Sequence, residues 1–189
     1  MNLQRYQKMC LRTTPNGSQE RDQIGRIVKR SINGVDGIKG AHAFYGIVDE
    51  LGELNTAINN HDMVNIREEI GDFFWYLALA CTAGRFSMDA LANKTVELEL
   101  IDDPQISIDH LLTQVACYAS ACKNIIFYNK AKPTMEPLAA LIQLLMGLCD
   151  HYGFGVQEIL DENQDKLQKR YPEKFSEEDA VERKDKEDV

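Results

Sequence analysis

The stretch that decides the fold is residues 46–81, GIVDELGELNTAINNHDMVNIREEIGDFFWYLALAC. Apolar residues recur in it at intervals of three and four on both sides of a short polar break, which predicts two antiparallel helices joined by a turn. Each predicted helix carries a pair of acids three positions apart, Glu50 with Glu53 on the first and Glu69 with Asp72 on the second. Because residues three apart lie on the same helix face, each pair forms one acidic facet.

A helical wheel places these acids beside apolar neighbours. Glu50 borders the apolar arc of the first helix, and Glu69 lies in the middle of the apolar stripe of the second. Arg67 and Gly71 point in nearly the opposite direction, so we expect that side of the second helix to face solvent. Partly buried carboxylates that lie close together repel one another and lose hydration, which destabilises the fold unless something compensates their charge.

Protonation, a basic partner or a divalent metal ion can supply this compensation. Neither acidic motif contains Lys or His, and Arg67 points away, which favours the metal. A ligand set made only of oxygen atoms selects hard cations, so we expect Mg²⁺, with Mn²⁺ able to take its place. The expected ligands are Glu50, Glu53, Glu69 and Asp72. Mg²⁺ held by carboxylates commonly binds substrate phosphates as well.

Composition excludes several classes of protein. The chain has 189 residues, of which 44% are hydrophobic, enough for one core. Its net charge of −9 argues against a nucleic-acid partner. The longest apolar run, 73–81, is far shorter than the roughly 18 residues that cross a bilayer, and the first residues lack the apolar stretch of a signal peptide. We therefore expect a cytoplasmic protein that does not bind membranes.

Cysteine and histidine spacing argues against disulfides and other metal centres. The five cysteines form no Cys-x-x-Cys pair, which is typical of buried thiols in a reducing compartment. No histidine lies three or four positions from another or follows a Glu-x-x, so a di-iron bundle is not expected.

The chain as a whole is expected to be all-α, a helical bundle built around a four-helix core. Asp62 and Ser107 are predicted N-caps, and Ser176 is expected to start a capping box. Residues 1–175 are predicted to form one domain, followed at 176–189 by a short helix and a charged tail. The expected helices are 3–12, 18–31, 39–59, 62–84, 87–99, 107–128, 134–152, 156–170 and 177–184.

Some residues match after a shift along the sequence. A shift of 67 places Val48 on Val115, and a shift of 68 places Leu77 on Leu145. Two degenerate helical-hairpin repeats would explain these matches, and so would chance agreement between similar packing patterns. The second half has no acids at the matching positions, which are Cys117, Ser120, Pro137 and Ala140.

The acidic motifs resemble those of the MazG-like family of all-α nucleoside triphosphate pyrophosphohydrolases. That family's signature is Glu-Glu-x-x-Glu, followed on the next helix by Glu-x-x-Asp, and residues 49–53 and 69–75 match it apart from position 49. Position 49 is Asp where the pattern usually has Glu, so its carboxylate reaches about one methylene less far. Further similar segments are Tyr6-Gln7, Arg12-Thr13, 42–46 and 163–172.

The resemblance implies Mg²⁺-dependent hydrolysis of a (deoxy)nucleoside triphosphate between its α and β phosphates, which gives a monophosphate and pyrophosphate. The acids at positions 50, 53, 69 and 72 would hold the metal, and Asp49 would help to activate the attacking water. Asn163, Lys166 and Arg170 lie on one face of a late helix, which suits phosphate oxygens, although a solvated helix edge has the same pattern.

Other interpretations stay open at this point. Short relatives dimerise, so a homodimer is expected, unless residues 107–152 replace the second subunit's helices. A catalytically inert helical module that binds nucleotide or a partner protein is the main alternative. A hydrolase of the same fold that acts on phosphoribosyl-ATP or nucleoside diphosphates would share these motifs. Trp75 and Tyr76 suit either a core or a stacked base.

Overall fold

The computed structural model describes residues 36–94, 103–128, 135–173 and 176–182, together with positions 7, 18, 21, 22, 24 and 25. Every regular element in these ranges is a helix, which confirms the predicted all-α class. The helices predicted at 3–12 and 18–31 lie almost entirely outside the described residues. The helices are α3 (Gly37–Asn59), α4 (Met63–Gly84), α5 (Met88–Ala92), α6 (Pro104–Tyr128), α7 (Glu136–Tyr152), α8 (Val156–Arg170) and α9 (Glu177–Glu182).

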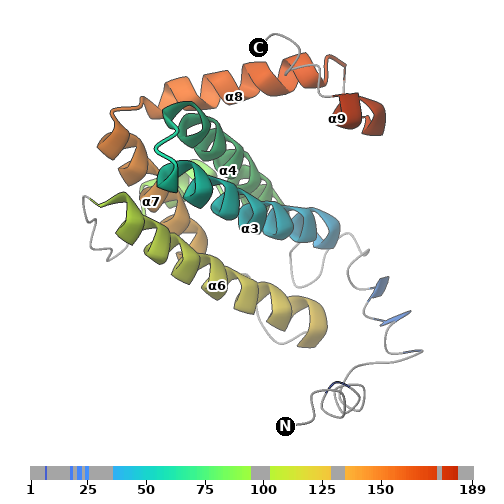
Figure 1. Ribbon diagram of the computed structural model, residues 1–189. Coiled ribbons are helices and arrows are strands. Elements are labelled where there is room, and N and C mark those ends of the chain that lie inside the picture. Colours follow the sequence, from blue (N-terminus) through green and yellow to red (C-terminus); the bar gives the residue numbers. More distant parts are fainter. Residues whose placement is uncertain are drawn as a thin grey trace.

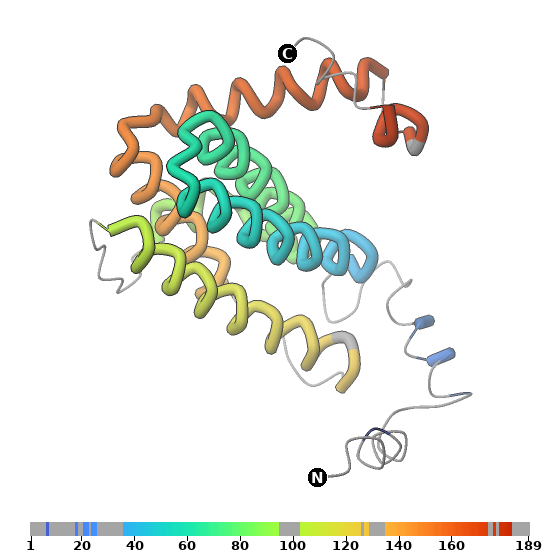
Figure 2. Tube along the Cα trace, viewed as in Figure 1, coloured from blue at the N-terminus to red at the C-terminus, as the bar shows by residue number. Residues whose placement is uncertain are grey.

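The predicted hairpin of α3 and α4 lies at the centre of the packing. Figure 1 shows α6 against α3, α7 between α6 and α4, and α8 on the other side of the hairpin from α6. The trace in Figure 2 shows that α8 follows α7 after a sharp bend and then packs on α4. The single domain at 1–175 with a short helix and tail after it, and the four-helix core of two repeats, stay predictions.

Apolar side chains fill the seams between α3, α4, α6 and α7. They include residues from each of these helices with almost no exposed surface. Their burial is the main favourable contribution to folding, and it sets the angle at which α3 and α4 meet. The largest of these side chains are Phe73, Ile47, Leu54, Ile66, Ile70, Leu77, Leu111, Leu138, Leu141, Ile142, Leu145 and Leu148.

Capping explains where several helices begin. Asp62 caps α4 as predicted, because its side chain accepts a backbone N–H of the first turn at 3.1 Å. Ser176 likewise accepts a backbone N–H of α9 at 3.1 Å. The prediction that Ser107 caps a helix is wrong, since α6 begins at Pro104. Proline fits the first position of a helix, where its missing N–H costs nothing, and the Asp103 side chain accepts the next backbone N–H at 2.9 Å.

The expectation that one side of α4 faces solvent is also wrong, because α8 covers it. Gly71 is buried there, and a Cβ at this position would lie 3.2 Å from Asn163 and 3.4 Å from Ile159. Arg67 is paired with Glu162 of α8, Nε to Oε2, at 2.6 Å. A helical wheel of α4 alone does not predict this contact. Helix α8 is polar, and it packs on α4 at Gly71 and through the ion pairs of Arg67.

Among the described residues, no single helix is long and apolar enough to cross a membrane. In this described part of the chain, α7 and α8 taken together pass the test of length and composition, and they are bent by 104° where they meet.

Two glycines of α3 give a matched test of the hairpin packing. A Cβ at Gly46 would lie 2.1 Å from the Tyr76 ring, whereas nothing lies within 4 Å of one at Gly52. Gly46→Ala is expected to lower the free energy of unfolding by about 1–3 kcal/mol through overpacking. Gly52→Ala is expected to raise it by about 0.5–1 kcal/mol, because alanine favours the helix. Urea unfolding measures both, and stabilisation by both variants would contradict the observed packing.

Candidate functional site

Three carboxylates converge in the seam between α3 and α4. One oxygen atom from each of Glu50, Glu69 and Asp72 lies within 4.8 Å of the others. Glu50 comes from α3 and is 8% exposed, while Glu69 and Asp72 come from α4 and are half-buried. Apolar residues on both helices hold the backbones together at this level, so the backbone segments that carry the carboxylates cannot separate without loss of core packing.

The buried side chain of Glu50 lacks a hydrogen-bond partner for one of its oxygens. Oε2 is inaccessible to solvent, and no described donor reaches it. A buried acceptor without a donor destabilises the folded state. A divalent cation among the three carboxylates would bind this oxygen and neutralise the group. The donor set therefore fits a hard metal ion.

Burial and mutual repulsion change how these acids titrate. Burial, with the charges of Asp72 and Glu69, raises the pKa of Glu50 to about 9. Burial and the charge of Glu53 raise the pKa of Glu69 to about 7. Without a metal ion, the site therefore holds protons near neutral pH, and a metal ion that binds there must displace them.

Helix α8 supplies two hydrogen-bond donors to the site. Asn163 Nδ2 donates to Asp72 Oδ1 at 2.6 Å, and Lys166 Nζ donates to Asp72 Oδ2 at 2.5 Å. The same ammonium group donates to Glu68 Oε1 at 3.2 Å. A basic partner is thus present, although it lies far along the chain from both acidic motifs. Arg170, also predicted to bind phosphate, is half-buried at the last residue of α8.

The remaining predicted site residues lie at the edge of the cluster. Glu53 is exposed and lies outside the group of three, but it lines a pocket of about 290 Å³ together with Glu69. Asn60 and Asn65, from the two ends of the hairpin turn, line the same pocket. Asp49 is exposed on α3 and is also outside the group of three.

Glu68 is the residue of the site that the sequence analysis does not find. It lies next to Glu69, but its partner Lys166 is 98 positions away. No local spacing signals such a pair. The one signal in the sequence that could have indicated Glu68 is its position one helical turn before Asp72, which places both carboxylates on the same face of α4.

Three aromatic rings, from His42 on α3 and from Trp75 and Tyr76 on α4, pack against one another. His42 packs edge-on against Trp75 and Tyr76, with ring centroids 5.9 Å and 5.6 Å away. Tyr76 is half-buried with its ring against Gly46, and Trp75 is 38% exposed. Tyr76 is therefore part of the hairpin packing, while part of the Trp75 ring is accessible.

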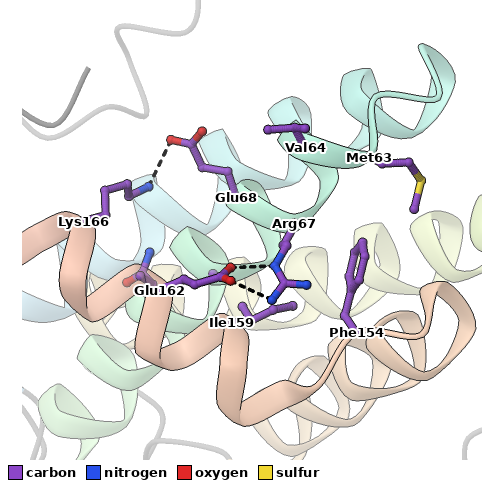
Figure 3. Close-up of a pocket in the computed structure, with 10 residues that line it drawn as sticks. Met63, Val64, Arg67, Glu68, Phe154, Ile159, Glu162 and Lys166 are labelled. Atoms are coloured by element: carbon purple, nitrogen blue, oxygen red, sulfur yellow. Dashed lines mark hydrogen bonds and ion pairs between the residues drawn. The ribbon is translucent and has the colours of Figure 1, made fainter. Parts of the chain in front are cut away.

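A second pocket, of about 450 Å³, lies between α4 and α8 (Figure 3). The Arg67 guanidinium lies 5.2 Å from the centroid of the Phe154 ring and is paired with Glu162. Glu68 and Lys166 line the same pocket. Lys166 therefore lies both in the wall of this pocket and beside the acidic cluster.

The part of the chain that carries the clustered acids matches a known family. The family model of the MazG nucleotide pyrophosphohydrolase domain matches residues 42–97. Over these residues the chain is similar to the MazG family. The match confirms the resemblance inferred from the acidic motifs, and the family that it identifies is one of hydrolases. The MazG segment contains all three clustered acids but neither Asn163 nor Lys166.

The searches of curated proteins and of solved structures give no match to this chain.

The raised pKa values predict how stability depends on pH. The pKa of Glu50 rises from 4.5 to about 9 on folding, and that of Glu69 rises from 4.5 to about 7. Above pH 4.5 the folded state thus binds more protons than the unfolded chain, so a rise in pH favours unfolding. Without divalent ions, the melting temperature is expected to fall steadily between pH 5 and pH 9, with the contribution of these acids lost above their folded-state pKa values.

Thermal unfolding in a chelator, at constant ionic strength, measures this decline. Glu50→Gln is the diagnostic variant. Because glutamine cannot ionise, the melting temperature of this variant should depend less steeply on pH. Mg²⁺ should restore stability most strongly at high pH. If the variant and the parent protein decline by the same amount, the buried carboxylates are not the cause.

Proposed function

We propose that this protein hydrolyses (deoxy)nucleoside triphosphates between the α and β phosphates, in a Mg²⁺-dependent reaction that releases a (deoxy)nucleoside monophosphate and pyrophosphate. The observation that carries the proposal is the cluster of Glu50, Glu69 and Asp72, which leaves a buried oxygen without a donor inside the MazG segment. An arrangement of this kind fits a metal-dependent reaction on phosphates.

The three clustered acids would hold the ion, and Mn²⁺ would substitute for Mg²⁺. When bound, the ion supplies neutralising charge for the phosphate oxygens and lowers the pKa of a coordinated water. Glu53 lies beside Glu69 on the accessible side of the cluster, which supports a role in holding metal together with substrate. We assign to Asp49, exposed on the same helix, a part in activating the attacking water.

Helix α8 supplies the groups proposed to bind the substrate. Lys166 and Asn163 are already hydrogen-bonded to Asp72, which supports contact with phosphates bound at the metal. Arg170 lies one turn beyond Lys166, where it would extend the same positive face toward the other phosphates. This face would orient the pyrophosphate leaving group.

An inert helical module that binds nucleotide or a partner is the second candidate. The ion pair between Lys166 and Asp72 favours it, because an internal cation already satisfies part of the cluster. One lysine faces several carboxylates, however, and Glu50 Oε2 still lacks a donor. A hydrolase of the same fold that acts on phosphoribosyl-ATP or nucleoside diphosphates would use the same acids.

We also propose a cytoplasmic homodimer that binds neither nucleic acid nor membranes. The net charge of −9 supports the absence of a nucleic-acid partner. Cys81, Cys117, Cys122 and Cys149 are free thiols, which supports a reducing compartment.

A substrate panel tests the activity. The protein is incubated with Mg²⁺ and each nucleoside and deoxynucleoside triphosphate, and pyrophosphate is resolved from orthophosphate. Pyrophosphate is the expected first product. Glu69→Gln should lower turnover by about 100-fold or more, because it removes a charged group that stabilises the transition state through the ion. Glu178→Gln, a matched change on exposed α9, should leave turnover unchanged.

Three results would contradict the proposal in different ways. Orthophosphate as the first product would exclude cleavage between the α and β phosphates. Equal turnover by Glu69→Gln would remove the assigned site. Nucleotide binding without turnover of any substrate in the panel, or of phosphoribosyl-ATP, would favour the inert module.

A further inference from the structure

Lys166 bridges two carboxylates that have different surroundings. Its Nζ atom lies 2.5 Å from Asp72 Oδ2 and 3.2 Å from Glu68 Oε1. The lysine side chain is 16% exposed, so water screens these ion pairs only weakly. Asp72 belongs to the group of three acids, and Glu68 does not. The ammonium group thus lies between the proposed metal site and a carboxylate outside it.

Both oxygens of Asp72 are already engaged. Asn163 donates to Oδ1 at 2.6 Å, and Lys166 donates to Oδ2. A divalent ion bound through Asp72 would lie about 2 Å from a carboxylate oxygen. It would then be only a few ångströms from the lysine ammonium, and two cations this close repel strongly in a sheltered site. The ammonium group and the ion therefore compete for Asp72.

Glu68 is placed to receive the ammonium group. Glu68 and Asp72 are four residues apart on α4, so their side chains lie one above the other on the helix surface. Lys166 already contacts Glu68, as Figure 3 shows. Rotation of the lysine side chain alone would move the ammonium group away from Asp72 and closer to Glu68. Helix α8 can stay in place meanwhile, because Arg67 holds it through Glu162 and Ile159 packs against Gly71.

We infer that Lys166 is exchanged between Asp72 and Glu68 when a divalent ion binds, and that Glu68 is the positioning residue that keeps the ammonium group beside the phosphates. In the free protein Lys166 neutralises part of the cluster and competes with the ion. After the exchange it lies at the edge of the site, directed by Glu68. The inference rests on the proposed function, since it requires an ion at the three acids.

Mn²⁺ binding to the full-length protein without nucleotide tests the competition. Lys166→Met removes the competing charge but keeps most of the side chain, and should bind Mn²⁺ about threefold to tenfold more tightly than the parent protein. Lys169→Met removes the same charge from an exposed position of α8 and should change the affinity by less than about twofold. Free Mn²⁺ is measured by electron paramagnetic resonance. Circular dichroism verifies the fold, and Lys166→Gln replaces Lys166→Met if the latter does not fold.

A double-mutant cycle tests the positioning role of Glu68. Glu68→Gln should weaken Mn²⁺ binding by about threefold, because Lys166 is then held by Asp72 alone. In the Lys166→Met background the same change should have no effect. If Glu68 acted only through its negative charge, the loss would be equal in both backgrounds, and its assignment as a positioning residue would be wrong.

The outcomes separate this inference from the function on which it rests. If the parent protein binds Mn²⁺ and neither variant at position 166 binds it more tightly, the exchange is wrong and the metal site stands. If Mn²⁺ binds to none of the proteins, the proposed metal site fails and the inference fails with it.

Discussion

The repulsion among three carboxylates in an apolar seam is the constraint on which the site depends. The packing of α3 on α4 buries Ile47 and Phe73, and the same contact carries Glu50 to within 4.8 Å of Glu69 and Asp72. Hydrophobic burial thus holds together groups that electrostatics drives apart. Protons relieve this repulsion at low pH, as the raised pKa values of Glu50 and Glu69 show. At higher pH a cation must do so.

Helix α8 supplies only part of the required positive charge. It docks on α4 through its buried residues Ile159 and Asn163 and through ion pairs. Arg67 anchors it through Glu162, and Lys166 extends one ammonium group to the cluster. A single lysine leaves the group of acids with excess negative charge. The same helix thus closes one face of α4 and leaves the site able to attract a divalent ion.

Local sequence patterns predict what depends on a single helix, and they fail where two distant segments meet. Apolar periodicity predicts α3 and α4 with errors of only a few residues, and acid spacing predicts the convergence of Glu50 with Glu69. The pattern does not reveal that α8 covers Gly71 or that Glu68 pairs with Lys166, because those partners lie more than 80 positions away. The exposed position of Glu53 likewise depends on how the two helices face each other, not on spacing within one.

The most direct test of the account is anomalous diffraction from crystals of the protein soaked in Mn²⁺. The account predicts an anomalous peak between α3 and α4, at about 2.0–2.3 Å from an oxygen atom of each of Glu50, Glu69 and Asp72. The ion at this peak should be bound by Glu50 Oε2, since this oxygen has no described hydrogen-bond donor. A map without a peak at this position, in crystals where the three carboxylates point into solvent, would contradict the central claim.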